Sequence, residues 1–403
     1  MKTTLDLFEH RTEALAEQLA SLADHPFYKE CFGDVDLSLV SSLETFAELP
    51  FTEAANFASD FEAAPPFGTH HSGDVVQMNL TPAGDSLMPE FNTDDDLDRM
   101  ASALADQFKR IGLGPDDVVL QCLGYELFIG GWAMHLGLQA AGVTVLPFGP
   151  GDSEQAADLA RRFEATGMVA NPSFGRKIAE QGEVKLDIFV GGGEPFTSVP
   201  GKREEVRAAF AGDPTVVDLF GLSEAIPVAA ECRHENGLHV ADDYIIVEII
   251  DPETGAHVAP GERGEAVLTH LEKDAMPLVR YRTGDLTTLV ESECECGRSL
   301  TLPAGVFGRV DNRLKVKGIK FYPDSIRPVL TQFPGLTGEF TVELSRSSGT
   351  DVVDIRCRAG DPGVVSVSEL SEALAEELLL TPDTIEVETE LQTDQQVVDN
   401  RFK

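Results

Sequence analysis

The stretch 218–225, with the sequence DLFGLSEA, joins an apolar run to a carboxylate in a way that could do chemistry. The apolar run ends at Gly221, and Ser223 and Glu224 follow it directly. This pattern predicts a sheet strand whose carboxyl end opens into a crevice, where open α/β sheets bind ligands. We therefore expect Glu224 to face a ligand or a metal ion, although a strand followed by a turn and a surface glutamate is also common.

Three other segments place polar residues after a glycine-marked strand end. They are VGGGEP at 190–195, YRTGD at 281–285 and GRVD at 308–311. Glycine punctuates strands at turns and at places where a ligand approaches the backbone closely. Four such strand ends in one chain argue against four unrelated turns.

In this order, and with GRVDNRLKVKGIKFYP at 308–323, these segments resemble the AMP-forming adenylate ligases, specifically the phenylacetate-CoA ligase branch. The similarity extends to 49–52, 124–131 and 398–401, so it covers nearly the whole chain. It implies a ligase that activates an aryl or acyl carboxylic acid with ATP to an acyl-adenylate and then forms a CoA thioester. The implied cofactors are ATP/AMP, Mg²⁺ and CoA, and the implied partner is a small-molecule carboxylic acid.

The resemblance also implies which residues bind the nucleotide. Phe220 matches the aromatic residue that stacks on adenine, and Glu224 matches the catalytic carboxylate that holds Mg²⁺, a cation that prefers oxygen ligands. Asp285 matches the carboxylate that grips the ribose hydroxyls, and Arg309 matches an arginine that reaches ribose or phosphate. The full expected set is Gly192, Gly193, Glu194, Pro195, Asp218, Phe220, Gly221, Ser223, Glu224, Asp285 and Arg309.

The resemblance places the acyl pocket along residues 124–131 and the helix that follows. It makes Tyr125, Phe128, Gly130 and Gly131 the expected substrate residues, with Trp132 beside them. Each of these residues taken singly could equally be part of an ordinary core.

The chain departs from the family at both places that would serve the triphosphate. The stretch 75–92 should hold the phosphate loop, but Pro82 removes a backbone donor and Asp85 stands about where a lysine belongs. Near the C-terminus, Thr393 falls at the adenylation lysine and Gln396 at a neighbouring arginine. Threonine cannot supply the positive charge that stabilises the developing phosphate transition state.

These departures keep two other functions open. The chain could be a catalytically impaired relative that binds a nucleotide or an acyl ligand as a regulatory or binding protein. It could also be an adenylating enzyme without CoA chemistry, although that reaction needs the same phosphate machinery.

Three cysteines and a histidine could hold a metal ion. Cys294 and Cys296 form a tight pair at a glycine turn, and Cys232 with one histidine would complete a tetrahedral Cys3His site. Residue spacing alone leaves free thiols equally open, and the family resemblance favours a structural zinc ion. His239 is the expected fourth ligand and His234 the alternative.

The order of elements predicts the fold class, α/β. A helix at 94–111 precedes alternating strands and helices to about residue 220, which predicts a parallel, layered sheet. Residues 244–290 alternate apolar and polar, which predicts a small antiparallel β subdomain. The prediction is a large α/β N-terminal domain at 1–309 and a small α+β C-terminal lid domain at 310–403.

Composition bounds the cellular setting. The 403 residues carry 69 acidic against 31 basic side chains, a net charge of −38. A coat of acidic side chains keeps a protein in solution at high salt and destabilises it at low ionic strength, which indicates a halophile. Such a surface suits neither nucleic acid nor an anionic membrane. We expect a cytoplasmic protein without a membrane partner, and the family resemblance makes a homodimer possible.

Overall fold

The computed structural model describes residues 3–83, 86–194, 196–199, 201–310, 314–316, 319–347, 350–378, 380–393 and 396–401. These fall into two compact units. The first contains Met1–Thr197, Arg203–Thr283 and Thr287–Gly305, and the second contains Ser198–Lys202, Gly284–Leu286 and Val306–Lys403.

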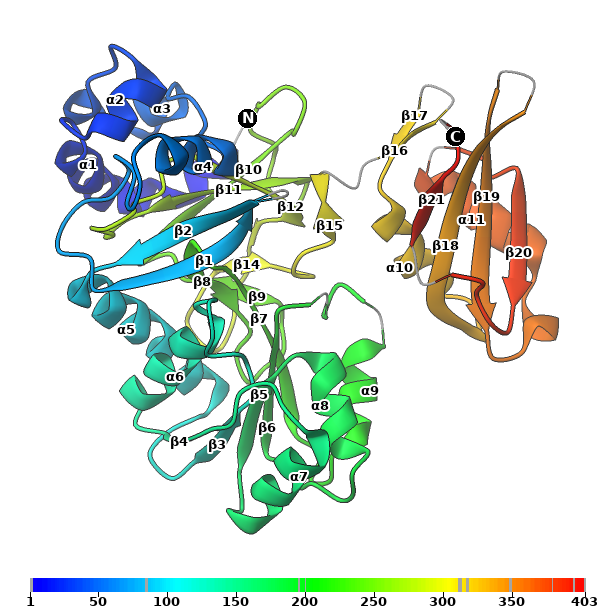
Figure 1. Cartoon of the computed structure of the whole chain (residues 1–403). Coiled ribbons are helices and arrows are strands. Elements are labelled where there is room, and N and C mark those ends of the chain that lie inside the picture. Colours follow the sequence, from blue (N-terminus) through cyan, green and yellow to red (C-terminus); the bar gives the residue numbers. More distant parts are fainter. Residues whose placement is uncertain are drawn as a thin grey trace. The chain divides into compact units, whose positions relative to one another are not determined.

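A nine-stranded sheet forms the centre of the first unit, in the order β13-β14-β9-β8-β7-β6-β5-β3-β4 (Figure 1). The strands from β4 to β7 are parallel, and the rest are antiparallel. Their bounds are β3 Val118–Gln121, β4 Thr144–Pro147, β5 Gly167–Ala170, β6 Ile188–Gly192, β7 Thr215–Leu222, β8 Ala225–Ala230, β9 Leu238–Val240, β13 Val290–Glu291 and β14 Leu300–Leu302. The parallel strands carry their carboxyl ends to one edge, where two of the predicted glycine-marked strand ends, at Gly192 and Gly221, lie.

Helices cover both faces of this sheet (Figure 1). Helices α5 (Asp94–Ile111) and α6 (Gly130–Ala140) pack on one face in a buried apolar cluster with strands β3, β5, β6 and β7. Helices α7 (Ser153–Arg162), α8 (Pro172–Ala179) and α9 (Lys202–Ala209) pack in a second cluster with other residues of the same sheet. Two buried faces explain why the parallel strands read as continuous apolar runs.

Capping residues in the sequence determine both ends of the long helix α5. The Thr93 side chain accepts from the Asp96 amide and forms a capping box at the N-terminus. The first turn is acidic and the last turn is basic, which suits the helix dipole. Gly112 ends the helix in the left-handed conformation with φ 113°.

A second sheet has the order β10-β11-β12-β15. Its strands up to β12, apart from residues 284–286, belong to the first unit with a group of short helices, and β15 belongs to the second unit. Its strands are β10 Ile245–Ile250, β11 Arg263–His270, β12 Tyr281–Thr288 and β15 Gly308–Arg309. The short helices are η1 Leu5–Arg11, α1 Thr12–Ser21, α2 Pro26–Phe32, η2 Leu37–Leu39, α3 Leu43–Ala47 and α4 Ala54–Ala63. Their apolar faces and the sheet share one core cluster.

Strands β1 (Gln77–Ala83) and β2 (Ser86–Asn92) form a separate antiparallel hairpin (Figure 1). Its register runs from Gln77 opposite Asn92 to Ala83 opposite Ser86. Only residues 84–85 therefore connect the two strands.

The second unit is an α+β fold around its own apolar core. A four-stranded sheet has the order β20-β19-β18-β21, and β16 pairs with β17. The elements are β16 Leu314–Val316, β17 Ile319–Phe321, η4 Pro323–Ser325, α10 Ile326–Leu330, β18 Leu336–Ser347, β19 Thr350–Ala359, η5 Pro362–Val364, α11 Val367–Leu378, β20 Thr384–Glu388 and β21 Val397–Asp399.

The predicted α/β fold class is confirmed by these sheets and helices. The predicted division at residue 309/310 stays a prediction, since the second unit also takes in residues 284–286 and begins its main segment at Val306. Among the described residues, no helix is both long and apolar enough to cross a lipid bilayer.

Candidate active site and metal centre

Glu224 lies in the turn between β7 and β8, and its side chain is buried, at 6% exposure. The hydroxyl of Tyr281 donates to its Oε1 at 2.7 Å, and the hydroxyl of Thr81 donates to its Oε2 at 3.3 Å. Both donors are neutral, so they orient the carboxylate without cancelling its charge. Carboxylate and hydroxyl oxygens are ligands that Mg²⁺ prefers, so this donor set fits the expected cation.

A pocket of about 420 Å³ opens at the carboxyl ends of strands β5, β6 and β7. Its described lining residues carry no charged side chain, which suits an uncharged, largely apolar ligand group. The lining is Leu123, Gly124, Phe128, Ile129, Gly130, Gly131, Met134, Val169, Asn171, Val190, Gly191, Gly192, Gly193, Leu219, Gly221, Leu222, Ser223 and Ile226. The structure thus brings together Phe128, Gly130 and Gly131 with predicted nucleotide residues Gly192, Gly193, Gly221 and Ser223 in one pocket.

Two glycines of this pocket have no room for a side chain. A Cβ at Gly131 would lie 2.0 Å from the carbonyl oxygen of Gly124. Gly193 has φ 80°, and a Cβ there would lie 2.6 Å from Nδ2 of Asn171. The same Asn171 amide donates to the carbonyl of Gly192 at 2.9 Å. Asn171 therefore fixes the backbone of the glycine loop, a role that the sequence did not indicate.

The expected residues Tyr125 and Phe220 do not line the pocket. The Tyr125 hydroxyl lies 3.1 Å from Nδ1 of His135, and the Trp132 indole donates to the Tyr125 carbonyl at 2.9 Å. Tyr125 therefore braces the loop that carries Phe128. Phe220 is half-buried and packs against the core of the antiparallel sheet.

Glu194 and Asp218 both make contacts that shape the loop around the pocket. The backbone N–H of Ser173, in the first turn of α8, donates to the Glu194 carboxylate. Asp218 accepts from the hydroxyl of Thr197 at 2.7 Å and from its backbone N–H at 3.1 Å. Burial raises the pKa of Asp218 to about 6, against the lowering effect of the Thr197 hydrogen bonds. Pro195 lies outside the described residues.

Asp285 and Arg309, both in the second unit, form an ion pair. Nη1 of Arg309 lies 3.0 Å from Oδ1 of Asp285, which is 8% exposed. The two residues face each other in the β12–β15 register. Their expected ribose and phosphate contacts stay predictions.

The stretch expected to bind phosphate is a regular hairpin. Its ladder continues to Ala83 and Ser86, where the two strands end. Asp85 lies outside the described residues. In the second unit, the side-chain amide of Gln396 donates to Asp324 at 2.8 Å, within that unit's own fold.

Two residues that sequence reasoning missed are those that hold Glu224. Tyr281 is the first residue of the YRTGD segment, in which the family resemblance points to Asp285. Thr81 lies on the hairpin strand β1, where polar residues alternate as Gln77, Asn79 and Thr81. That alternation was the available signal for a polar strand face.

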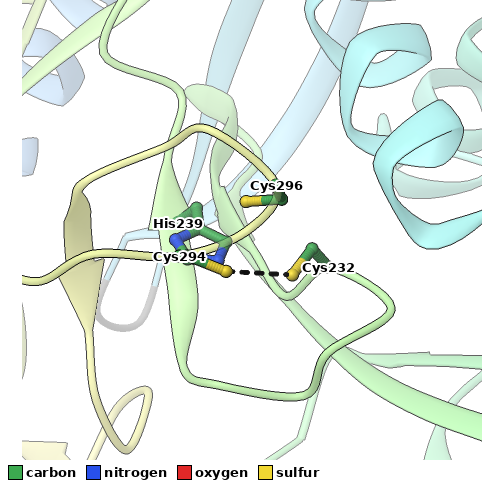
Figure 2. Close-up of side chains that lie close together, drawn as sticks. All are labelled: Cys232, His239, Cys294 and Cys296. Atoms are coloured by element: carbon green, nitrogen blue, oxygen red, sulfur yellow. Dashed lines mark hydrogen bonds between the residues drawn. The ribbon is translucent and has the colours of Figure 1, made fainter.

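The four predicted metal ligands lie together, although they come from three separate places in the chain (Figure 2). Ligand atoms of Cys232, His239, Cys294 and Cys296 all lie within 4.8 Å of one another. The Sγ atoms of Cys232 and Cys294 are 3.6 Å apart. Three sulfur ligands and one imidazole nitrogen are a set that zinc binds with tetrahedral geometry in structural sites.

The structure favours His239 over His234 as the fourth member. Nδ1 of His239 lies 3.1 Å from the Thr301 hydroxyl, and its buried Nε2 has no hydrogen-bond partner within the described part of the chain. Burial lowers the pKa of His239 to about 4, helped by Arg110 and Arg298, so the imidazole is neutral as a metal ligand must be. His234 instead lies 4.0 Å from Glu295.

Two arginines of α9 hold the chain on both sides of Cys232. Arg203 donates to the two carboxylate oxygens of Glu231 at 2.7 and 2.8 Å. Arg207 donates to those of Glu235 at 2.6 and 2.5 Å. These ion pairs fix geometry as well as charge, so the Cys232 turn is tied to α9.

Comparison with known proteins agrees with these features. A family model described as AMP-binding enzyme matches residues 95–270. The phenylacetate-coenzyme A ligase of Thermus thermophilus is 29% identical over 371 residues, which is 88% of this chain and 81% of that protein. The phenylacetate-coenzyme A ligase of Escherichia coli is 31% identical over 276 residues, which is 66% of this chain and 62% of that protein.

Solved structures share the fold. The crystal structure of 2-hydroxyisobutyryl-CoA ligase in complex with 2-HIB-AMP aligns with a TM-score of 0.83 at 24% identity, over 97% of this chain and 89% of that one. Its complex with 2-HIB-AMP and CoA in an open conformation gives a TM-score of 0.79. The family match and the sequence relatives support the assignment of this chain to the phenylacetate-coenzyme A ligase branch of the AMP-binding enzymes, and the solved structures share its fold.

Proposed function

We propose that this chain is an AMP-forming acid–CoA ligase. A carboxylic acid attacks the α-phosphate of ATP to give an acyl-adenylate and pyrophosphate, and the thiol of CoA then displaces AMP. The observation that carries the proposal is the buried Glu224 carboxylate, held by two hydroxyls beside an uncharged pocket of about 420 Å³. Sequence relatives at 29% and 31% identity are phenylacetate-coenzyme A ligases.

In this proposal Glu224 holds Mg²⁺, which supplies positive charge to the phosphate oxygens when bound. Gly192 and Gly193 let the adenine lie against the backbone, and Phe128, Gly130 and Gly131 receive the acyl group. Asp285 accepts hydrogen bonds from the ribose hydroxyls. Because the pocket lining is uncharged, it suits an acid whose only charge is the reacting carboxylate.

The test is pyrophosphate release from ATP and Mg²⁺ in molar KCl, with a panel of aryl and fatty acids, beside calorimetric binding of AMP and ATP. Release that depends on the acid and is lost in Glu224→Ala establishes the ligase. Binding of AMP without turnover rejects it.

One observation favours a second candidate, a nucleotide-binding relative without adenylation. The β1–β2 ladder runs through Ala83 and Ser86, so the expected phosphate loop is largely regular strand, in which alternate backbone amides face the partner strand. A phosphate cradle needs such amides turned toward the ligand. The same experiment separates the two functions.

We propose in addition that Cys232, His239, Cys294 and Cys296 hold a structural zinc ion. The support is the 4.8 Å cluster of ligand atoms and the unpartnered Nε2 of His239. With four protein ligands, no position is left for a substrate. Metal analysis of protein purified without added zinc should find about one zinc per chain.

We also propose that the chain works in a cytoplasm of high salt. The supporting observation is its net charge of −38. Repulsion within such a surface falls as salt screens it.

A further inference from the structure

The β1–β2 hairpin turns its polar face inward. Residues that face each other across an antiparallel ladder share a face, and side chains alternate along each strand. The inward face therefore carries Gln77, Asn79, Thr81, Met88, Glu90 and Asn92. Asn79, Thr81, Glu90 and Asn92 are 2–5% exposed, whereas Met78 and Leu87 on the other face are 43% and 49% exposed.

An ordinary amphipathic hairpin buries an apolar face, whereas this hairpin buries four polar side chains on one face, together with Phe91 on the other. Burying polar groups costs free energy unless each finds a partner. Met88 shows that the same face accepts an apolar residue. A fold that needed only stability at this face would be served by apolar side chains, so the polar residues point to a task at the site they face.

Lys273 supplies the charge that this face requires. It is 4% exposed and lies between β11 and β12. Its Nζ is 3.2 Å from Oε1 of Glu90 and also donates to the side-chain carbonyl of Asn92. The Asn92 amide donates to both oxygens of Glu90, at 2.8 and 2.9 Å. The Gln18 side chain fixes the Lys273 backbone through bonds of 2.9 and 3.1 Å.

The hairpin register connects the Lys273–Glu90 ion pair to the carboxylate of Glu224. Glu90 is opposite Asn79, and Thr81 lies two residues further along the same strand and face. Thr81 makes the 3.3 Å hydrogen bond to Oε2 of Glu224. The neighbouring Leu80 amide donates to the Leu127 carbonyl at 2.8 Å, which also ties the strand to the loop of the acyl pocket.

The carboxylates of Glu90 and Glu224 also interact electrostatically. Burial raises the pKa of Glu90, and the charge of Glu224 raises it further, whereas Lys273 lowers it. Without Lys273, an ionised Glu90 would repel Glu224 or take up a proton. Either change would disturb the polar face that holds Thr81.

We propose that Lys273 and Glu90 are positioning residues that hold the Thr81 hydroxyl on Glu224 and so set the affinity for Mg²⁺-bound ATP. The inference rests on the proposed ligase function. It assigns no contact between Lys273 or Glu90 and the nucleotide. Both residues act through the hairpin.

The test uses the full chain in molar KCl. Calorimetry gives the affinity for ATP with Mg²⁺, and the pyrophosphate assay gives the KM for ATP and for the acid. The variants are Lys273→Met, Thr81→Val, the double variant of these two, and the neutral pair E90Q/K273M. Asp242→Asn is the matched control, because it removes one charge from a largely buried network with Arg298, His10 and Arg11 in the same unit.

We expect Lys273→Met and Thr81→Val each to weaken Mg²⁺-dependent ATP binding about tenfold, the effect of losing one hydrogen bond to a charged group. The KM for the acid should change less than about twofold, since neither substitution changes the charge of the acyl pocket. The double variant should also bind ATP about tenfold more weakly rather than about a hundredfold, because both changes remove the same hydrogen bond from Thr81 to Glu224. E90Q/K273M should bind ATP within about threefold of the unmodified chain, because Asn92 can still bond the amide at residue 90.

Three results overturn the inference while leaving the ligase function intact. They are an active Lys273→Met variant with unchanged ATP affinity, equal losses for ATP and acid, and additive effects of Lys273→Met and Thr81→Val. Asp242→Asn should lower thermal stability alone, and a matching loss of ATP affinity in it would also count against the inference. An unmodified chain that neither binds Mg²⁺-dependent ATP nor releases pyrophosphate overturns the proposed function itself, and the inference with it.

Discussion

The hydroxyl of Tyr281 donates to Oε1 of Glu224 at 2.7 Å, although the two residues are 57 positions apart. Tyr281 begins β12 in the antiparallel sheet, and Glu224 follows β7 in the nine-stranded sheet. One hydrogen bond thus joins these two sheets at the carboxylate that we propose for Mg²⁺.

Replacing Tyr281 with phenylalanine should weaken ATP binding only when Mg²⁺ is present. The change removes one hydrogen bond to a charged group, which is worth about 1.5 kcal/mol or somewhat more, or about a tenfold rise in Kd. Calorimetry with ATP and Mg²⁺, and with AMP in a chelator, measures both affinities. If AMP and Mg²⁺-bound ATP lose affinity equally, Tyr281 does not act through the cation site.

Asp218 should make stability fall as pH rises. Its pKa is raised by burial to about 6, above the ordinary 3.8, so the folded chain holds a proton that the unfolded chain has released between these values. Stability from this group is complete below the lower pKa and is lost as pH rises through the upper one. Asp218→Asn cannot ionise and should lack this loss.

Urea unfolding at about pH 4.5 and about pH 7.5 measures the effect. The stability of Asp218→Asn relative to the unmodified chain should improve by about 2 kcal/mol between the two pH values. A difference that stays constant with pH would show that the Asp218 carboxyl is not held in its neutral form.

Alanine at Gly131 should damage the acyl pocket, whereas alanine at Gly130 should not damage the fold. A Cβ at Gly131 would lie 2.0 Å from the Gly124 carbonyl oxygen, but a Cβ at Gly130 meets nothing within 4 Å. Overpacking of this kind costs roughly 1–3 kcal/mol or more. Thermal unfolding should separate the two variants, and the KM for the acid should rise in Gly131→Ala. Equal stability of the two would contradict the close approach of the loops.

His239→Ala should reduce bound zinc, and His234→Ala should leave it unchanged. Only His239 has its imidazole within the cluster of ligand atoms. Loss of one of four ligands typically lowers the affinity of a structural zinc site by orders of magnitude. Cobalt substitution with absorption spectroscopy reports the ligand set directly. The reverse ranking of the two variants would make His234 the ligand.

Potassium chloride should stabilise the chain strongly. With 69 acidic and 31 basic residues, self-repulsion is large at low ionic strength. Raising KCl from about 0.1 M to about 2 M shortens the Debye length from about 10 Å to a few Å and should raise the unfolding midpoint by about 10 °C or more. Sucrose at equal osmolality serves as the uncharged control, and an equal rise in sucrose would argue against charge screening.

The sequence revealed those parts of the site that depend on local pattern. Apolar runs that end at glycine predicted the strand ends at Gly192 and Gly221, because burial and backbone freedom act over a few residues. The Cys and His positions predicted the metal cluster, since few residue types suit a transition metal. The ladder and the contact between Glu90 and Lys273, 183 residues apart, are set by tertiary packing that no local pattern records. For the same reason, the motifs identify Tyr125 and Phe220 but not their contacts. Tyr125 lies against His135, and Phe220 packs against the core of the antiparallel sheet.

The buried polar face of the β1–β2 hairpin has a consequence for the order in which the first unit folds. Hydrophobic collapse buries Met88 and Phe91 of this hairpin, but it does not stabilise the polar side chains that the hairpin also buries. Those side chains find their hydrogen-bond partners only once Lys273, Glu224 and the Leu127 carbonyl are in place. The hairpin should therefore be the last piece of the first unit to fold and the first to open, with amide exchange faster than in the central sheet. The catalytic centre would then form only after the rest of the first unit has folded.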